Sequence, residues 1–159
     1  KSSLSNRLAN EFNVTEDRVL LGYGAEDLLK QVIQTYLNRT RKKLLVPDHS
    51  WWYYKEIAKE VKGQHVEYPI VVGEDSYEYD IDKLLKIYNS EKPEVVFIAS
   101  PNNPTGNSIS HDQLSYVLDR MSDSIVVLDE AYWFSSNNKY LLAVSAYAKK
   151  CWITIIKSC

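Results

Sequence analysis

The sequence predicts an α/β fold with three layers, α/β/α, built around a mainly parallel sheet. Short apolar runs rich in β-branched residues alternate along the chain with segments whose apolar residues recur at helical spacing. The runs are apolar on both faces, as strands of a parallel sheet are when helices cover them. With 159 residues, of which 45% are hydrophobic, the chain is long enough for one domain with its own core.

The elements follow in order along the chain. Apolar residues recur at helical spacing over 4–12, and a second helix is predicted after Gly24, with two carboxylates in its first turn. The acidic segment 74–80 is expected to be a solvated loop, with Asp80 capping the helix that follows. The predicted strands cover residues 44–46, 66–72, 94–99, 125–128 and 152–156, and the later helical patterns cover residues 57–61, 81–88, 111–121 and 141–150.

The balance of charges limits the classes of partner. The chain has 19 Lys and Arg against 21 Asp and Glu, a net charge of -2, so no basic surface for nucleic acid or an anionic membrane is expected. We see no transmembrane span or signal peptide, and the two cysteines suit a reducing compartment, so we expect a cytoplasmic protein. The three histidines have no metal-ligand spacing, and no metal site is predicted.

Two polar loops directly follow apolar strands, and the ligand site of such a sheet lies where these loops gather. The first is the segment 100–106, in which Ser100-Pro101 and Asn103-Pro104 are bonds that tolerate the cis form. The alternative for this loop is a plain proline-rich turn. The second loop begins with Asp129, whose carboxylate is costly at the end of a buried strand unless a cation or several donors meet it; the alternative is a helix cap.

These residues carry a family resemblance. The motif Ser-Pro-Asn-Asn-Pro-Thr-Gly at 100–106, followed by Asp-Glu-Ala-Tyr at 129–132, resembles the fold-type I pyridoxal-phosphate-dependent aminotransferases of class I and II. The resemblance is nearest to the histidinol-phosphate aminotransferase branch. It extends to the segment 20–29, with its Gly-Ala-Glu-Asp turn, and to the aromatic loop at 48–54, so four motifs in order span nearly the whole chain.

The resemblance implies the cofactor pyridoxal 5'-phosphate and a role for each matching residue. The backbone amides of Gly24, Ala25 and Glu26 would face the phosphate at a helix N-terminus, and Ser158 would also bind it. The remaining roles fall to Trp51, which would stack on the pyridine ring, Asn103 and Tyr132, which would donate to the phenolic oxygen, and Asp129, which would face the pyridinium nitrogen. For Trp51 and Tyr132 the alternative is packing in the core, and some of the four aromatic residues at 51–54 are expected to be core residues.

The resemblance also implies what this chain does not include. The Schiff-base lysine of the family would fall just after Cys159, so no catalytic residue is assigned within the chain, and Lys157 is interpreted as a strand residue. We expect residues 1–159 to be part of the large, cofactor-binding domain, without the small C-terminal domain. On its own this fragment is expected to be inactive, whereas the intact parent would be a homodimer acting on small amino-acid and keto-acid substrates.

The implied function is transfer of an amino group between an amino acid and a 2-oxo acid. A decarboxylase or C–S lyase of the same fold would share every motif, because the cofactor is common and other residues choose the reaction. A non-catalytic regulatory or binding domain of the same fold is a further alternative. A dinucleotide-binding module is disfavoured, because Asp27 stands where the third glycine of its fingerprint is needed.

Overall fold

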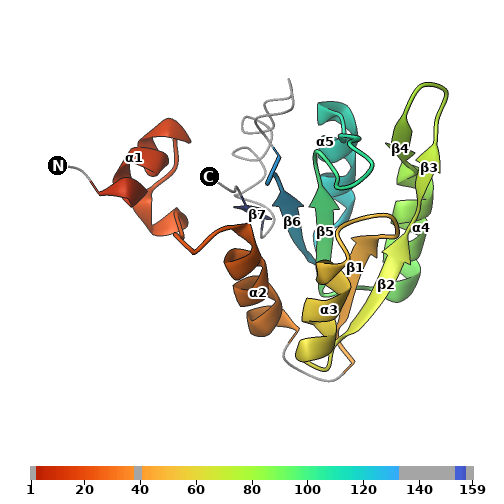
Figure 1. Cartoon of the computed structure of the whole chain (residues 1–159), viewed down its shortest axis with the longest axis horizontal. Coiled ribbons are helices and arrows are strands. Elements are labelled where there is room, and N and C mark those ends of the chain that lie inside the picture. Colours follow the sequence, from red (N-terminus) through yellow and green to blue (C-terminus); the bar gives the residue numbers. More distant parts are fainter. Residues whose placement is uncertain (1–2, 38–40, 133–152, 157–159) are drawn as a thin grey trace.

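The computed structural model describes residues 3–37, 41–132 and 153–156, and its centre is a parallel sheet (Figure 1). The strands are ordered β2-β1-β5-β6-β7, and every neighbouring pair is parallel. Their bounds are Lys43–Pro47 for β1, Gln64–Tyr68 for β2, Val95–Ala99 for β5, Ile125–Asp129 for β6 and Ile153–Ile156 for β7. The prediction of a parallel α/β sheet is confirmed.

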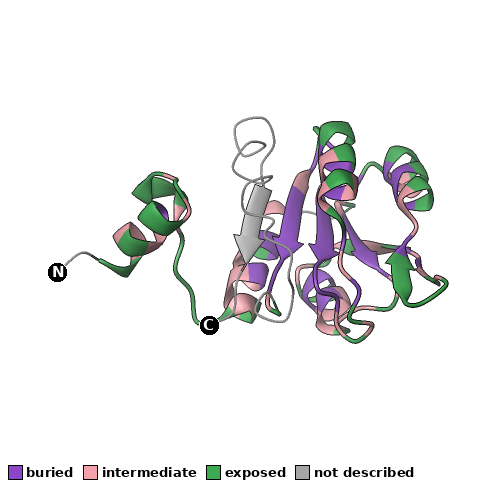
Figure 2. Cartoon of the chain, turned by 90° about the horizontal axis from the view of Figure 1, so that it is seen from above, coloured by how far each residue is buried: buried purple, intermediate pink, exposed green. Residues whose placement is uncertain are grey.

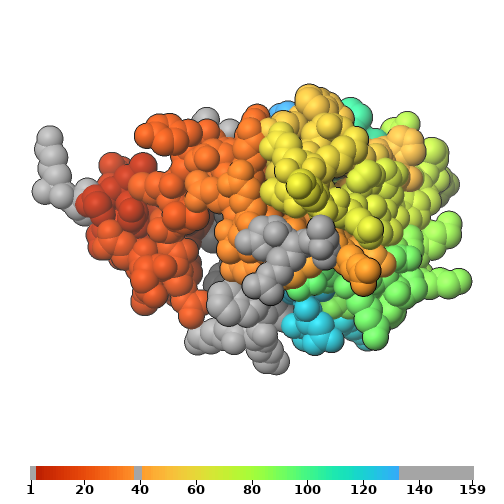
Figure 3. All heavy atoms as spheres, turned by 90° about the horizontal axis from the view of Figure 1, so that it is seen from below, coloured from red at the N-terminus to blue at the C-terminus, as the bar shows by residue number. Residues whose placement is uncertain are grey.

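Helices α2 to α5 flank the sheet, whereas α1 and the 3-10 helix η1 lie apart from it at the N-terminal end (Figure 1). The helices agree with the predicted helical segments, except that η1 was not predicted. Their bounds are Leu4–Glu11 for α1, Glu16–Arg18 for the 3-10 helix η1, Ala25–Tyr36 for α2, Tyr53–Glu60 for α3, Ile81–Glu91 for α4 and His111–Arg120 for α5. The N-terminal residues lie at one end of the molecule, red in Figure 3, and the green segments around α4 lie at the other. The helix predicted over residues 141–150 lies outside the described residues.

The two faces of the sheet bury separate cores because side chains alternate along each strand. In β5, Val95 and Phe97 pack with α2 and α3, whereas Val96 and Ile98 pack with α4 and α5. All five residues of β5 are buried, as expected for a central strand covered on both sides. Figure 2 shows the buried strands between helices whose outer faces are exposed, which is the predicted three-layer arrangement.

The single strand predicted over residues 66–72 is wrong. The strand is interrupted at Pro69, because proline has no amide hydrogen to donate to a neighbouring strand. β2 ends at Tyr68, and β3, Ile70–Val72, instead pairs antiparallel with β4, Tyr77–Tyr79. The acidic loop predicted over 74–80 therefore contains a short strand, while Asp80 caps α4 as predicted by accepting a hydrogen bond from the Lys83 amide at 3.0 Å.

The register of the sheet brings the two polar loops together. β5 lies between β1 and β6, and Ala99 at the end of β5 is paired with Asp129 at the end of β6. Because the strands are parallel, the loops that follow β1, β5 and β6 emerge at the same edge. Both proline bonds named above are cis in the loop after β5.

Candidate functional site

A pocket of about 350 Å³ lies at the carboxyl ends of β5 and β6, beside the N-terminus of α2. Its volume is in the range of small-molecule sites, and this edge is where ligands bind in open α/β sheets. The lining residues are Gly24, Ala25, Glu26, Trp51, Tyr54, Ala99, Pro101, Asn103, Asp129, Ala131 and Tyr132. Seven of the eight residues predicted to bind the cofactor are thus brought together; the eighth, Ser158, lies outside the described residues.

The N-terminus of α2 forms one wall of the pocket. Gly24 precedes the helix with φ 89° and ψ 173°, a backbone conformation almost restricted to glycine. A Cβ at this position would meet nothing within 4 Å, so the conformation rather than space requires the glycine. The amides of the first turn have no acceptor within the helix, and the helix dipole favours an anion near them. This wall is therefore suited to an anionic group such as a phosphate.

The start of α2 is held by its own side chains. Oδ2 of Asp27 accepts hydrogen bonds from the Tyr23 amide at 3.0 Å and from Nε2 of Gln31 at 3.1 Å. Gly22 is needed for close packing, because a Cβ there would lie 2.7 Å from the side chain of Leu28. Asp27 therefore stabilises the turn that carries Gly24.

Asp129 supplies the buried carboxylate of the pocket. Only 5% of this residue is exposed. Its Oδ2 accepts a hydrogen bond from the Tyr54 hydroxyl, and its Oδ1 accepts one from the Ala131 amide at 3.0 Å. Burial raises the pKa of Asp129 above its ordinary value, and the two hydrogen bonds oppose that rise because they favour the charged form. None of the ion pairs formed by the described residues includes Asp129.

The role of Tyr54 was missed by the sequence analysis, which treated the aromatic run 51–54 as a source of core residues. Its ring does pack in the core, 5.0 Å from the ring of Phe97 in an edge arrangement. Burial, and then the neighbouring charge of Asp129, raise the pKa of the Tyr54 hydroxyl well above its ordinary value. The hydroxyl therefore keeps its proton and acts as a donor. The signal that could have found it is its position three residues after Trp51, at the start of a helix facing the site.

Asn103 and Tyr132 lie side by side at the mouth of the pocket. Nδ2 of Asn103 donates to the hydroxyl of Tyr132 over 3.3 Å, and half of Tyr132 is exposed. The two side chains come from the loops after β5 and β6, which the sheet register places next to each other. An amide and a hydroxyl so close together can both donate to one ligand oxygen.

Trp51 contributes an aromatic wall. Its ring centroid lies 5.6 Å from that of Tyr54 in an edge-to-face arrangement and 5.1 Å from that of Tyr53 at a tilt. The ring is partly buried against the core of α2 and α3 and also lines the pocket. The two interpretations offered for Trp51, core packing and a stacking surface, are therefore compatible in this geometry.

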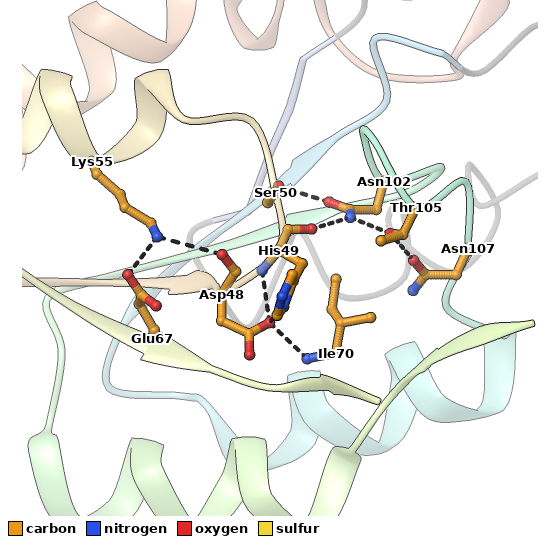
Figure 4. A network of polar contacts seen from close by, with 9 residues as sticks. All are labelled: Asp48, His49, Ser50, Lys55, Glu67, Ile70, Asn102, Thr105 and Asn107. Atoms are coloured by element: carbon orange, nitrogen blue, oxygen red, sulfur yellow. Dashed lines mark hydrogen bonds and ion pairs between the residues drawn. The ribbon is translucent and has the colours of Figure 1, made fainter. Parts of the chain in front are cut away.

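A network of hydrogen bonds ties the loop of Trp51 to the loop of Asn103 (Figure 4). At its centre is Asn102, of which only 3% is exposed. Its Nδ2 donates to the His49 carbonyl at 2.7 Å and to the Thr105 hydroxyl, and its Oδ1 accepts from the Ser50 hydroxyl at 2.7 Å. No role was predicted from the sequence for Asn102, which directly precedes Asn103.

Asp48 anchors the same loop from the other side. Its Oδ1 accepts from the amides of His49 at 2.7 Å and Ile70 at 2.9 Å, and it lies 2.8 Å from Nδ1 of His49. Burial acts to raise the pKa of Asp48, yet these hydrogen bonds lower it overall below its ordinary value. The carboxylate thus takes the amide hydrogen that Ile70 presents after the break at Pro69, and it connects β3 to the loop after β1.

Two further findings concern the described part of the chain. No helix there is both long and apolar enough to span a bilayer. Among the same residues, no group of three or more His, Cys, Asp or Glu side chains is placed to hold a metal ion.

The family model described as "Aminotransferase class I and II" matches residues 2–155. Among curated proteins, the histidinol-phosphate aminotransferase of Ruminiclostridium cellulolyticum is 32% identical over 144 residues, which are 91% of this chain and 40% of that protein. The histidinol-phosphate aminotransferase 2 of Nitrosospira multiformis is 34% identical over 139 residues, 87% of this chain and 33% of that protein. The chain thus spans well under half the length of these relatives.

Solved structures show the same fold. The histidinol-phosphate aminotransferase of Sinorhizobium meliloti in complex with pyridoxal-5'-phosphate superposes with a TM-score of 0.85 at 19% identity, covering 98% of this chain and 41% of that one. A pyridoxal-phosphate-bound C–S lyase from Staphylococcus hominis superposes with a TM-score of 0.80 at 18% identity, covering 99% of this chain and 44% of the lyase chain. At these identities the comparison establishes the fold.

Proposed function

Because the chain belongs to the class I and II aminotransferase family, we propose that the full-length protein is a pyridoxal-phosphate-dependent aminotransferase of the histidinol-phosphate aminotransferase type. It moves an amino group between an amino acid and a 2-oxo acid. The observation that carries this proposal is Asp129, a buried carboxylate that lines the pocket and forms no ion pair with a described residue. A charge in such a place is stabilised by a cationic group of a ligand, and a protonated pyridine ring is such a group.

The other donors of the pocket fit pyridoxal phosphate as well. The first-turn amides of α2 would hold its phosphate, and Asn103 and Tyr132, 3.3 Å apart, would both donate to its phenolic oxygen. Trp51 would lie against one face of the ring. Each part of the cofactor thus meets a group of complementary chemistry, from three loops and one helix terminus of this chain.

The residues of this chain have distinct tasks in the proposed reaction. When bound, pyridoxal phosphate supplies an electron sink for negative charge that develops on the Cα atom of the substrate. Asp129 keeps the ring nitrogen protonated, which strengthens that sink, and the Tyr54 hydroxyl holds the carboxylate in place. Asn103 and Tyr132 stabilise negative charge on the phenolic oxygen. The names of the curated relatives favour amino transfer over the decarboxylase and C–S lyase alternatives.

The proposal extends to the organisation of the full-length protein. Residues 1–159 would form part of the large, cofactor-binding domain, and the lysine that binds the cofactor covalently would follow Cys159. Ser158 would add a hydroxyl to the phosphate site. A homodimer in the cytoplasm is part of the same proposal; the length of the curated relatives, well beyond that of this chain, supports the larger architecture.

Amino transfer by the full-length protein is the test. The purified protein is freed of cofactor, titrated with pyridoxal phosphate, and supplied with amino donors, including histidinol phosphate, and with 2-oxo acid acceptors. We expect saturable cofactor binding and formation of the amino acid that corresponds to the acceptor. Binding without transfer from any donor would favour the regulatory or binding domain of the same fold, and no binding would overturn the proposal.

A further inference from the structure

We propose that the hydrogen bond from Ser50 to Asn102 is a positioning contact that sets the separation of Trp51 and Asn103 across the pocket. This inference rests on the proposed function, because it concerns how the pocket holds a flat ring. Ser50 immediately precedes Trp51, and Asn102 immediately precedes Asn103. The hydrogen-bonded pair Ser50 and Asn102 is therefore adjacent in sequence to the pair Trp51 and Asn103, which lines the pocket.

Asn102 is a hub whose polar groups are all used. Both hydrogens of its side-chain amide are donated, to the His49 carbonyl and to the Thr105 hydroxyl, and its side-chain oxygen accepts from Ser50. Its backbone amide donates to the Asn107 carbonyl at 2.8 Å, and its carbonyl accepts from the Gly106 amide at 2.8 Å. The side chain joins two loops, while the backbone closes one of them on itself.

The pairing of β1 with β5 stops before the two loops begin. β1 and β5 are neighbours in the sheet, but their paired residues are Leu44 with Val95 and Leu45 with Val96, before the ends of both strands. Beyond that register, the Asn102 side chain joins the two loops through its hydrogen bonds with His49 and Ser50. A buried side chain with satisfied polar groups is costly to rearrange, because any displacement leaves a donor or acceptor unpaired.

It follows that two adjacent residues of the motif at 100–106 have different roles. Asn103 would touch the cofactor, whereas Asn102 touches the loop that carries the aromatic wall. With the contact intact, the face of Trp51 and the amide of Asn103 are held for a ring between them before it binds, which lowers the entropic cost of binding. Without it, the bond from Asn102 to His49 still joins the loops but holds them less firmly, and the cofactor must order them on binding.

Ser50→Ala isolates this contact, since it removes one hydroxyl and leaves the bond from Asn102 to His49. Ser50→Thr restores a hydroxyl and serves as the rescue variant. The control is Ser124→Ala. Ser124 is more buried than Ser50, and its hydroxyl donates to the Pro93 carbonyl and lies 3.3 Å from the Tyr88 hydroxyl, just before β6 and at the opposite edge of the sheet. Two quantities are measured on the full-length protein: amide hydrogen exchange without cofactor, and the dissociation constant of pyridoxal phosphate.

We expect Ser50→Ala to accelerate exchange in residues 49–54 and 102–107 and to raise the dissociation constant, each about five-fold, as loss of one neutral hydrogen bond implies. Ser50→Thr returns both toward wild type, and Ser124→Ala leaves both within about two-fold. Unchanged exchange in residues 102–107 of Ser50→Ala overturns the inference, as does equal weakening by Ser124→Ala. If the wild-type protein binds no pyridoxal phosphate, the proposed function fails, and the exchange result alone decides whether the contact couples the loops.

Discussion

The hydroxyl of Tyr54 donates a hydrogen bond to Oδ2 of Asp129, so the first turns of α3 reach the end of β6 and hold its carboxylate. The two residues are 75 positions apart in the chain and both are buried. The bond gives the carboxylate a fixed donor on one oxygen, while the Ala131 amide occupies the other. Asp129 is thereby oriented before any ligand arrives.

Tyr54→Phe tests this relationship, because the ring and its packing against Phe97 are kept while the donor is removed. We expect the free energy of unfolding to fall by about 1–3 kcal/mol, since a buried carboxylate loses a partner. We also expect the pKa of Asp129 to rise further, because the lost bond favours the charged form. Denaturant unfolding and an NMR titration of labelled aspartate carboxyl carbons measure the two effects.

Tyr68→Phe is the matched control for that variant. Tyr68 is fully buried and its hydroxyl donates to the Phe97 carbonyl at 2.9 Å rather than to Asp129. This variant should also lose stability, but the titration of Asp129 should stay as in the wild type. The same shift of the Asp129 pKa in both variants would argue that the Tyr54 contact has no specific effect.

Asp129→Asn should change how stability depends on pH in the cofactor-free protein. Burial raises the pKa of Asp129 above its ordinary 3.8, so the folded state binds this proton more tightly than the unfolded state. The wild type therefore loses stability relative to Asp129→Asn as pH rises from about 4 through the raised pKa. Chemical denaturation at about pH 4 and about pH 7 measures the free energy of unfolding of both proteins. Relative to the wild type, the variant should be more stable at the higher pH than at the lower one. A difference independent of pH would contradict the buried, raised-pKa assignment.

Gly24→Ala should damage the anion-binding wall through the backbone. An alanine fits sterically but is strained at φ 89°, at a cost of about 1–3 kcal/mol, or shifts the turn to relieve that strain. If the first-turn amides hold a phosphate, the variant should weaken binding of pyridoxal phosphate more than binding of pyridoxal, which lacks the phosphate. Calorimetric titration measures the affinities of the wild type and the variant for both compounds. An equal loss of affinity for the two would contradict phosphate binding at this wall.

Tyr132→Phe should alter the titration of the bound cofactor. If the Tyr132 hydroxyl donates to the phenolic oxygen, its removal destabilises the anionic form, and the pH at which the absorbance of the bound cofactor changes should move upward. Tyr116→Phe is the control, because Tyr116 is similarly exposed but lies on α5, outside the lining of the pocket. If the pH of this absorbance change is the same in Tyr132→Phe as in the wild type, Tyr132 does not donate to the phenolic oxygen and has a packing role.

The sequence was informative where a single pattern decides the structure. The apolar run before Asp129 predicted a buried strand, and the composition of the loop at 100–106 predicted a site beside it, because parallel strands place such loops at one edge. The hairpin of β3 and β4 was not predicted. Its strands have three residues each, too few for an alternating pattern to stand out from a loop.

Contacts made by polar atoms of buried residues were equally hidden. Aromatic residues at 51–54 predicted burial of some of their rings, but a ring pattern does not reveal that the Tyr54 hydroxyl meets a carboxylate far along the chain. In the same way, the sequence does not distinguish the roles of the adjacent residues Asn102 and Asn103, because their side chains are identical. Only the fold shows that Asn103 lines the pocket whereas Asn102 bonds to the neighbouring loop.

The most direct test of the central claim is the rate at which an amino donor converts the bound cofactor of the full-length protein to its amine form, compared between wild type and Asp129→Ala. Stopped-flow absorbance records this single turnover without an acceptor. We predict that Asp129→Ala binds cofactor, stays folded and reacts at least about 100-fold more slowly, because the ring nitrogen loses its anionic partner. A variant that reacts at nearly the wild-type rate would contradict the assignment of Asp129, and with it the proposed chemistry of the pocket.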